Sequence, residues 1–321
     1  MAKIIVTGAA GFIGAAVARA LLARGDTVIG VDNLNPYYDV ALKQARLQTL
    51  TPHRGFSFLQ ADIADKSVLP ALTATGARAI IHLAAQPGVR YSLEDPFAYV
   101  TANMMGHTVM LEAARALNVA HFVYASSSSV YGANKKTPFA VGDPVDHPNS
   151  LYAATKRADE IFTQAYTHLY GFPCTGLRFF TVYGPWGRPD MAPMLFAKAI
   201  SAGEPIKVFN HGEMWRDFTY IDDIVDGVLR ALDRPPPGEV PHAVYNLGNN
   251  RSEKLTDFIA EIEKALGKKA QMVMSPMQPG DVAATWADID ASTAALGYQP
   301  TTPISAGVPK FVDWFWSYYR A

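Results

Sequence analysis

Short runs of β-branched and aromatic residues alternate with longer amphipathic stretches through the first half of the chain. Each short run has the length of a buried strand, and each longer stretch has apolar positions at helical spacing. The expected strands cover residues 3–7, 27–31, 56–60, 79–83 and 121–125, and the first expected helix covers residues 12–24. Strands that alternate with helices form a parallel sheet with helices on both faces. The pattern therefore predicts a doubly wound α/β fold with right-handed crossovers.

The pattern loosens in the second half of the chain. Proline and glycine gather over residues 184–193, which predicts a loop. Beyond it, we expect helices over 194–202, 220–233, 252–266 and 307–319 and a strand over 206–210. Ser252 is expected to cap the third of these helices. The second half thus predicts a smaller α/β unit.

Composition and charge narrow the class of protein. The 321 residues carry a formal net charge of -1 and are 49% hydrophobic and 18% charged, as is typical of globular proteins. A charge near zero argues against nucleic acid as a partner, because proteins that bind it usually have a basic surface. We find no signal peptide and no apolar run long enough for a membrane span, and the lone Cys174 fits a reducing compartment. We expect a cytoplasmic protein without a metal, membrane or nucleic-acid partner.

A glycine-rich turn joins the first predicted strand to the first predicted helix. Gly8, Gly11 and Gly14 stand three residues apart, and Phe12 and Ile13 open the helix. Glycine lets the backbone turn tightly and approach a pyrophosphate, which the N–H groups at the start of the helix would bind. A tight turn without a ligand is the alternative. The position of the turn, at the first strand–helix junction, favours a dinucleotide site.

An acidic residue directly follows the second predicted strand. Asp32, which precedes Asn33, can accept hydrogen bonds from both adenosine ribose hydroxyls and would repel a 2′-phosphate, so we expect NAD rather than NADP. Lys43 and Arg46 follow and could soften this preference. Later strand ends add candidates: Asp62 and Ile63 at the adenine, and Leu83, Ala84 and Ala85 against the cofactor.

Tyr152 and Lys156 lie four residues apart, which places both side chains on one face of a helix. A nearby ammonium, like the positive ring of oxidised nicotinamide, stabilises a phenolate and lowers the pKa of a tyrosine from its usual value of about 10. Such a pair can remove a hydroxyl proton while hydride leaves the adjacent carbon. Two ordinary residues on a helix face are the alternative, because this spacing often occurs by chance.

Four serines, Ser126 to Ser129, follow the strand that is expected to end at Ala125. Strand ends of this kind are where doubly wound sheets bind their ligands, so Ala125 is a cofactor candidate. Serine hydroxyls both donate and accept hydrogen bonds, as required by a sugar oxygen that changes between alcohol and ketone. A polar turn is the alternative for at least one of the four.

Together these motifs resemble the extended short-chain dehydrogenase/reductases over essentially the whole chain. Longer strings resemble the UDP-glucuronate 4-epimerases: DNLNPYYD at 32–39, RYS at 90–92, FFTVYGPWGRPDM at 179–191 and MQPGDV at 277–282. The resemblance implies a Rossmann-type doubly wound parallel sheet with a smaller C-terminal α/β substrate domain. Residues 1–182, with 219–248 returning to them, would form the NAD-binding domain, and residues 183–218 and 249–321 would form the UDP-sugar domain.

The resemblance also implies roles for single residues. Tyr152 is then the base, Lys156 its electrostatic partner and a ligand of the nicotinamide ribose, and Ser127 the assisting hydroxyl. Asn103 would support the cofactor site from a core helix, and Phe180 would lie beside the nicotinamide pocket. The implied UDP-sugar ligands are Arg216 at the diphosphate, Val208 and Phe209 at the uridine, and Asp281 in the last matching string.

Two features indicate which sugar is bound. Arg188 can clamp a glucuronate carboxylate through a bidentate pair, and Thr181 can add a hydroxyl; a surface loop arginine is the alternative. Related decarboxylases and dehydratases carry acids at the positions of Ser128 and Ser129, so neutral hydroxyls fit an enzyme that returns the uronate intact.

The resemblance thus implies interconversion of UDP-glucuronate and UDP-galacturonate through a 4-keto intermediate that turns over and is reduced again with the same tightly bound NAD. The alternatives are a 4-epimerase of UDP-glucose and UDP-galactose, or a non-catalytic NAD-binding protein. Segments 97–117 and 150–170 resemble helices that relatives pair into a dimer, so we expect a homodimer. Met104, Met105, Val109 and Leu111 are candidates for its apolar surface, and could equally face the sheet.

Overall fold

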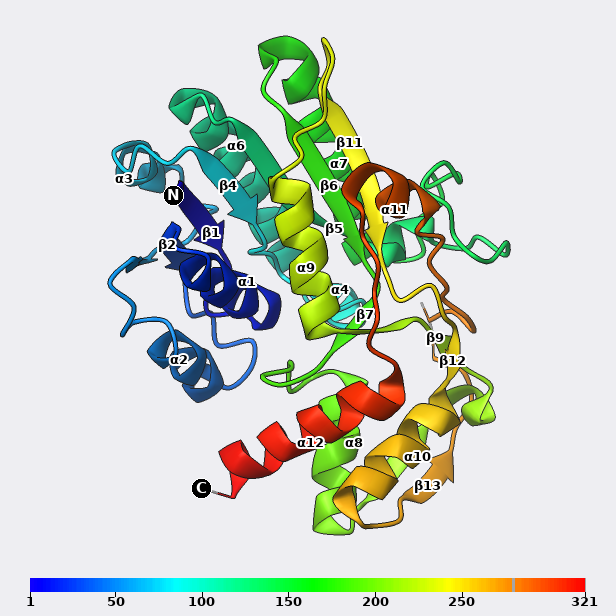
Figure 1. Ribbon diagram of the computed structural model, residues 1–321. Coiled ribbons are helices and arrows are strands. Elements are labelled where there is room, and N and C mark those ends of the chain that lie inside the picture. The colour runs from blue at the N-terminus through cyan, green and yellow to red at the C-terminus, as the bar shows by residue number, and fades with distance from the viewer. Residues whose placement is uncertain (279–280, 321) are drawn as a thin grey trace.

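Seven parallel strands form the central sheet, in the order β11-β6-β5-β4-β1-β2-β3 (Figure 1). The computed structural model describes residues 1–278 and 281–320. The strands are β1 (Lys3–Thr7), β2 (Thr27–Asp32), β3 (Phe56–Gln60), β4 (Ala79–His82), β5 (His121–Ser127), β6 (Cys174–Phe179) and β11 (His242–Leu247). The order reverses direction at β1, which confirms the predicted doubly wound α/β fold.

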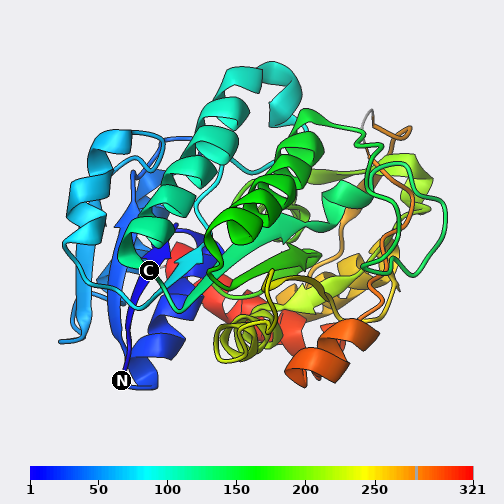
Figure 2. The same cartoon turned by 90° about the horizontal axis from the view of Figure 1, so that it is seen from above.

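Helices cover both faces of this sheet (Figure 2). On one face lie α1 (Phe12–Ala23) and α9 (Ile221–Leu232); on the other lie α3 (Leu69–Thr73), α6 (Gly106–Leu117) and α7 (Leu151–Tyr170). Because side chains alternate along a strand, Ile4 and Val6 pack into one core with α1, whereas Ile5 packs into the other core with α6. This double coverage explains why the strands are apolar at nearly every position.

The connection between β4 and α6 contains several short helices. They are α4 (Tyr91–Glu94), α5 (Pro96–Tyr99) and a π-helical turn η2 (Val100–Met105), which runs directly into α6. Helix α2 (Val40–Gln48) follows β2. Short 3-10 turns follow two other strands: residues Lys66–Val68 come after β3, and residues Ser128–Tyr131 come directly after β5. Segment 97–117 is therefore not the single regular helix that the resemblance suggested.

Most of the remaining elements gather at the carboxyl ends of the main strands, toward the bottom of Figure 1. Two short parallel pairs form there, β7 (Thr181–Tyr183) with β10 (Phe218–Tyr220) and β8 (Pro205–Val208) with β13 (Gln271–Met274). Helix α10 (Leu255–Leu266) packs against both α8 (Ala192–Ala202) and α12 (Ile304–Tyr319). Another helix, α11 (Asp290–Leu296), instead packs against β11 and α9, although it lies within the segment predicted for the substrate domain.

Two local predictions are wrong. Ser252 does not cap a helix, because residues Glu253–Lys254 (β12) pair with Trp215–Arg216 (β9), and α10 starts only at Leu255, whose N–H donates to Met214 O. Strand pairing thus overrides a favourable capping residue. The predicted strand 206–210 ends at Val208, because residues Phe209–Gly212 turn back with positive φ at Asn210 and His211.

The surface residues proposed for a dimer are only partly exposed. Met105 is 53% exposed and Met104 is half-buried, but Val109 and Leu111 are buried in the core between α6 and the sheet. Other exposed apolar side chains on α4, α5, η2 and α7 are Leu93, Phe97, Val100, Ile161, Leu169 and Tyr170. Among the described residues, no helix has the length and apolar character needed to cross a membrane.

Candidate active site

A pocket of about 450 Å³ lies at the carboxyl ends of the main strands, between the sheet and the C-terminal elements. It brings together most of the predicted site residues. Those lining it are Gly8, Gly11, Phe12, Ile13, Gly14, Asp32, Asn33, Asp62, Ile63, Leu83, Ala84, Ala85, Ala125, Ser127, Ser128, Ser129, Tyr152, Lys156, Phe180, Thr181, Arg188, Arg216 and Asp281. Asn103, Val208 and Phe209 do not line it.

The glycine turn is packed so closely that side chains cannot enter it. Gly8 has a φ of 71°, and a Cβ there would lie 2.8 Å from the backbone nitrogen of Ala84. A Cβ on Gly14 would lie 2.0 Å from Gly8 O. Helix α1 then starts with no capping side chain among the described residues and no acid in its first turn. Its first N–H groups therefore suit an anionic group such as a pyrophosphate.

Asp32 is held at the end of β2 by backbone donors. Its Oδ2 accepts a hydrogen bond from Ala10 N at 3.1 Å and its Oδ1 accepts one from Leu34 N at 2.8 Å. Each carboxylate oxygen can accept a second hydrogen bond, so the group can still take ribose hydroxyls from the pocket. Asn33 donates from Nδ2 to Asp62 Oδ2 at 3.0 Å, which joins the two predicted adenosine-side residues. These features fit the adenosine half of a dinucleotide.

The two basic residues that follow Asp32 differ in what they contact. Lys43 lines the pocket, and its Nζ donates to Asn35 O at 2.6 Å. Arg46 is 1% exposed and does not reach the pocket, because its guanidinium donates to backbone oxygens of Ala10 and Trp186. Arg46 thus ties the glycine turn to the loop that carries Arg188, and cannot soften the preference for NAD as a phosphate ligand.

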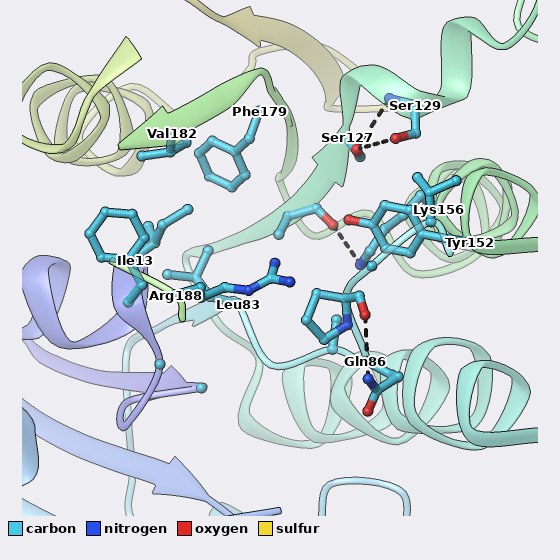
Figure 3. Close-up of a pocket in the computed structure, with 18 of the residues that line it drawn as sticks. Ile13, Leu83, Gln86, Ser127, Ser129, Tyr152, Lys156, Phe179, Val182 and Arg188 are labelled. Carbon is cyan, nitrogen blue, oxygen red and sulfur yellow. Dashed lines mark hydrogen bonds between the residues drawn. The ribbon is translucent and has the colours of Figure 1, made fainter. Parts of the chain in front are cut away.

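Tyr152 and Lys156 enter the pocket from the first two turns of α7 (Figure 3). Ser150 starts this helix, since its Oγ accepts a hydrogen bond from Ala153 N at 3.1 Å. Lys156 is 3% exposed, and its Nζ donates to Ala125 O at 2.9 Å and to Asp159 Oδ2 at 3.1 Å. The spacing of four residues therefore does place the phenol and the ammonium at one wall of one pocket.

The serine run divides into two kinds of side chain. Ser127 caps the turn that follows β5: its Oγ accepts from Ser129 N at 3.1 Å and donates to Ser129 Oγ at 3.2 Å (Figure 3). Ser126 instead donates to Glu160 Oε1 at 2.6 Å, and Glu160 pairs with the buried Arg178. The hydroxyl of Ser126 therefore takes part in a buried hydrogen-bond network, in agreement with the structural alternative for one of the four serines.

Asn103 lies behind the pocket wall. It sits in the π-helical turn and is 1% exposed; its Oδ1 accepts from Gln86 N at 2.7 Å, and its Nδ2 donates to Gln86 O at 3.2 Å and to Thr155 Oγ1 at 3.0 Å. It thereby fixes the loop after β4 to α7. Tyr99 adds a hydrogen bond to Pro87 O at 2.8 Å. π-Helical turns often occur at functional sites, and this one aims an amide at the loop that lines the pocket.

Arg188 lies on the loop between β7 and α8 and extends into the pocket (Figure 3). Its Nε donates to Asp190 Oδ1 at 3.1 Å, and its Nη2 donates to Asp190 Oδ2. Tyr37 also donates to Asp190 Oδ2, at 3.1 Å. Burial alone would raise the pKa of Asp190, but Arg188 and Tyr37 outweigh it and lower the pKa. Burial, helped by Asp190, raises the pKa of Tyr37 to about 12.

Arg216 and Asp281 form an ion pair at the other end of the pocket. Arg216 Nη2 donates to Asp281 Oδ1 at 2.7 Å, and Arg90 Nη2 lies 3.9 Å from Asp281 Oδ2. Burial lowers the pKa of Arg216, against the opposing effect of Asp281. Pro279 and Gly280, which belong to the matching string 277–282, lie outside the described residues.

The two residues predicted at the uridine do not line this pocket. Val208, the last residue of β8, is fully buried in the core. Phe209 is half-buried at the turn that follows, where the guanidinium of Arg90 lies 5.2 Å from its ring centroid. The predicted contact of Val208 and Phe209 with the uridine therefore stays a prediction.

About two fifths of the described residues that line the pocket were not considered in the sequence analysis. These residues are Asn35, Tyr37, Tyr38, Ala61, Gln86, Pro87, Gly88, Val89, Ala102, Gly132, Phe139, Asn149, Phe179, Val182, Met191, Val282 and Thr285. Many of them follow a predicted strand or belong to a matching string, so position after a strand end was the signal available. In the part of the chain that the structure describes, no group of three His, Cys, Asp or Glu side chains is arranged to hold a metal ion.

Comparison with known proteins agrees with this geometry. Residues 4–248 match the model of the NAD dependent epimerase/dehydratase family. A probable UDP-glucuronate 4-epimerase of Rhizobium meliloti is 45% identical over 334 residues, covering 99% of this chain and 98% of the relative. The chain therefore belongs to the NAD dependent epimerase/dehydratase family.

Two solved structures are similar over nearly their whole length. The UDP-glucuronic acid 4-epimerase of Bacillus cereus, in complex with UDP-glucuronic acid and NAD, is 36% identical with a TM-score of 0.91 and coverage of 98% of this chain and 99% of that one. The UDP-glucose 4-epimerase of Thermotoga maritima, with UDP-glucose, is 29% identical with a TM-score of 0.87 and coverage of 98% and 99%. The resemblance inferred from the motifs is confirmed.

Proposed function

We propose that this protein interconverts UDP-glucuronate and UDP-galacturonate by inverting C4 with tightly bound NAD. The observation that carries the proposal is one pocket holding both an aromatic base with its lysine and a guanidinium able to bind a carboxylate. The similarity to UDP-glucuronate 4-epimerases, one of them solved with UDP-glucuronic acid and NAD, supports it.

The residues present fit NAD. The turn of Gly8, Gly11 and Gly14 would hold the pyrophosphate, with Phe12 and Ile13 at the helix start, and Asp32 would accept the adenosine ribose hydroxyls. Asn33, Asp62 and Ile63 would border the adenine, and Leu83, Ala84, Ala85, Ala125 and Phe180 would line the remaining path to Lys156. NAD bound there supplies the hydride acceptor and the hydride donor of a reaction without net redox.

Tyr152 would act as the base that removes the C4 hydroxyl proton and as the acid that returns it. Its phenolate, stabilised by the ammonium of Lys156, takes the proton of the C4 hydroxyl, and Ser127 hydrogen-bonds the same sugar oxygen. The resulting 4-keto sugar turns over about its diphosphate linkage and presents its other face. Tyr152 then returns the proton. Arg216 would hold the diphosphate throughout, and Asp281 would position that guanidinium.

The carboxylate of the sugar substrate should be surrounded by neutral hydroxyls and one cation. A 4-keto uronate is a β-keto acid that loses carbon dioxide readily. Ser128, Ser129 and Thr181 offer neutral hydroxyls, and Arg188 offers the cation. Asn103 acts from behind the wall through Gln86. This set holds the carboxylate without adding an acid that would promote further chemistry.

We propose that the chain divides into two functional domains. Residues 1–182 with 219–248 serve as the NAD-binding domain, and residues 183–218 and 249–321 as the UDP-sugar domain. We also propose a cytoplasmic homodimer, joined through the exposed apolar side chains of α4, α5 and η2 and Ile161 of α7. The free, buried Cys174 fits a reducing compartment.

The test is to incubate the purified protein with UDP-glucuronate, without added cofactor, and to identify the product by NMR. UDP-galacturonate, with no NADH released, is the expected result. A decarboxylated pentose as the main product refutes the proposed role of the serines, and stoichiometric NADH indicates a net dehydrogenase. Turnover of UDP-glucose but not of the acid favours the neutral-sugar epimerase. NAD bound with no turnover of either sugar favours a non-catalytic protein.

A further inference from the structure

The proposed catalytic pair has a third charged neighbour. Asp159 lies one helical turn after Lys156 on α7, and its Oδ2 accepts a hydrogen bond from Lys156 Nζ at 3.1 Å. Asp159 is 0% exposed and Lys156 is 3% exposed. Solvent ions screen buried charges weakly, so the carboxylate acts on the lysine, and through it on Tyr152, with little attenuation.

Asp159 makes few other polar contacts. Its second oxygen, Oδ1, is buried and has no hydrogen-bond partner among the residues that the structure describes. A buried acceptor without a donor costs free energy, so a carboxylate serving only the fold would be poorly placed here. Burial, opposed by Lys156, raises the pKa of Asp159 to about 6. Above that pH the side chain is an anion directed at Lys156.

The surroundings add little competing charge. Near Lys156 and Asp159, the titratable and charged groups on α7 and on the elements packed against it are, on β4, His82; on α4, Tyr91; on α5, Tyr99; on α6, His107; on β5, Tyr124; on β6, Cys174 and Arg178; on β11, His242; and on α7 itself, Tyr152, Arg157 and Glu160. Arg188 and Asp190 lie across the pocket. Burial lowers the pKa of His82 to about 3 and that of His242 to about 4. Burial also holds the pKa of His107 well below the ordinary value of a histidine.

The imidazoles are thus neutral between pH 6 and 9, and Glu160 is paired with Arg178 and Arg157. Asp159 is therefore the anion in direct contact with Lys156 in the described part of the chain.

We propose that Asp159 is the counter-ion of Lys156 and that its negative charge limits how strongly the lysine favours the Tyr152 phenolate. Asp159 is a positioning residue, since it acts on substrate only through Lys156 and Tyr152; the inference rests on the proposed function. A phenolate that is stabilised too strongly is a poor base, whereas one stabilised too weakly seldom forms. The carboxylate holds the pair between these extremes and keeps Lys156 next to Ala125 O.

The test compares Asp159→Asn with wild type in a pH–rate profile for UDP-glucuronate. The amide keeps a hydrogen-bond acceptor for Lys156 but removes the charge. We expect the acid limb of kcat to move to lower pH by roughly one unit. Asp226→Asn, which removes one charge from the surface of α9, is the matched control and should leave the profile in place.

A second measurement requires no substrate. The ultraviolet absorbance of tyrosinate is measured against pH for four proteins with NAD bound: wild type, Tyr152→Phe, Asp159→Asn and the double variant. Subtracting the curve of each protein that carries Tyr152→Phe from the curve of its counterpart with Tyr152 isolates the ionisation of Tyr152 in the two backgrounds. The ionisation midpoint of Tyr152 should be lower in the Asp159→Asn background. If wild type turns over no UDP-sugar, the proposed function fails, and this titration still decides the role of Asp159.

Asp159→Ser is made in parallel, in case the asparagine variant does not fold, and circular dichroism verifies folding of each protein. A uniform loss of turnover with an unmoved midpoint, or a midpoint moved to higher pH, overturns the proposal.

Discussion

Arg188 donates two hydrogen bonds to the carboxylate of Asp190, two residues further along the same loop. This is the bidentate geometry that a substrate carboxylate would also use. Tyr37 binds the same carboxylate and so connects the loop after β2 to the loop after β7. A uronate entering the pocket must share the guanidinium with Asp190 or replace Asp190 as its partner.

Removing the guanidinium should therefore affect acidic and neutral sugars differently. We expect Arg188→Ala to weaken binding of UDP-glucuronate by about 10- to 100-fold, as is typical when a charge-assisted bidentate pair is lost. Binding of UDP-glucose should change little, because it presents no carboxylate. Calorimetric titration of both ligands provides the comparison, with Arg230→Ala on the surface of α9 as control. An equal loss of affinity for both UDP-sugars would show that Arg188 does not recognise the substrate carboxylate.

Asp32 should determine cofactor choice. Its carboxylate is fixed by Ala10 N and Leu34 N, and Lys43 Nζ is held nearby by Asn35 O. We expect Asp32→Ala to weaken NAD binding by about 10- to 100-fold while NADP binding improves, because the repulsion of a 2′-phosphate is lost and Lys43 remains. Dissociation constants for the two cofactors, measured on cofactor-stripped protein, test this. Unchanged discrimination between NAD and NADP would contradict the assignment.

Arg46 should couple cofactor and sugar binding through the fold. Its buried guanidinium donates to Ala10 O beside the glycine turn and to Trp186 O and Gly187 O beside Arg188. Arg46→Met keeps much of the side-chain volume but leaves these acceptors without a donor. We expect the free energy of unfolding to fall by about 3 kcal/mol or more, and both ligands to bind more weakly.

Urea denaturation tests the stability effect of Arg46→Met. Arg230→Met, at an exposed ion pair, should cost less than about 1 kcal/mol. If Arg46→Met costs no more than this control, Arg46 does not join the two loops.

Much of this arrangement could be predicted from sequence because its signals are local. The glycine turn, Asp32 and the Tyr152/Lys156 pair each combine a residue type with a fixed place relative to a strand or helix end. The burial of the Val208 side chain could not be predicted in the same way, because the face that a short edge strand buries depends on packing against distant helices.

Tertiary contacts also decided several other features. The loop at Gln86 is set by Asn103 from a π-helical turn, and the start of α10 is set by pairing with β9. Asp159 carried no motif, and its importance follows only from the distance to Lys156. Such contacts join segments far apart in the sequence, and the residue pattern of neither segment predicts which partner it will contact.

A second buried carboxylate predicts a pH effect on stability. Asp217 is 0% exposed and accepts hydrogen bonds from Asn249 N at 2.6 Å and Ala287 N at 3.0 Å, and burial raises its pKa to about 6. A carboxyl whose folded-state pKa is raised stabilises the fold most below its unfolded-state pKa, and that contribution disappears as pH rises through 6. Between pH 4 and 7 this group should lower the free energy of unfolding by about 2 to 3 kcal/mol.

Urea unfolding at several pH values, for wild type and for Asp217→Asn, isolates this contribution. The difference in stability between the two proteins should shift in favour of the variant as pH rises from 4 to 7. A difference that does not depend on pH would show that Asp217 does not titrate in this range.

The central claim is that the phenol of Tyr152 moves the C4 proton in a pocket loaded with NAD. Tyr152→Phe removes one oxygen from a half-buried side chain, so the fold and the cofactor turn should be unaffected. Turnover of UDP-glucuronate, followed by NMR at equal protein concentration, should fall by a factor of about 100 or more, while the NAD content per chain equals that of wild type. Turnover close to the wild-type rate would contradict the account.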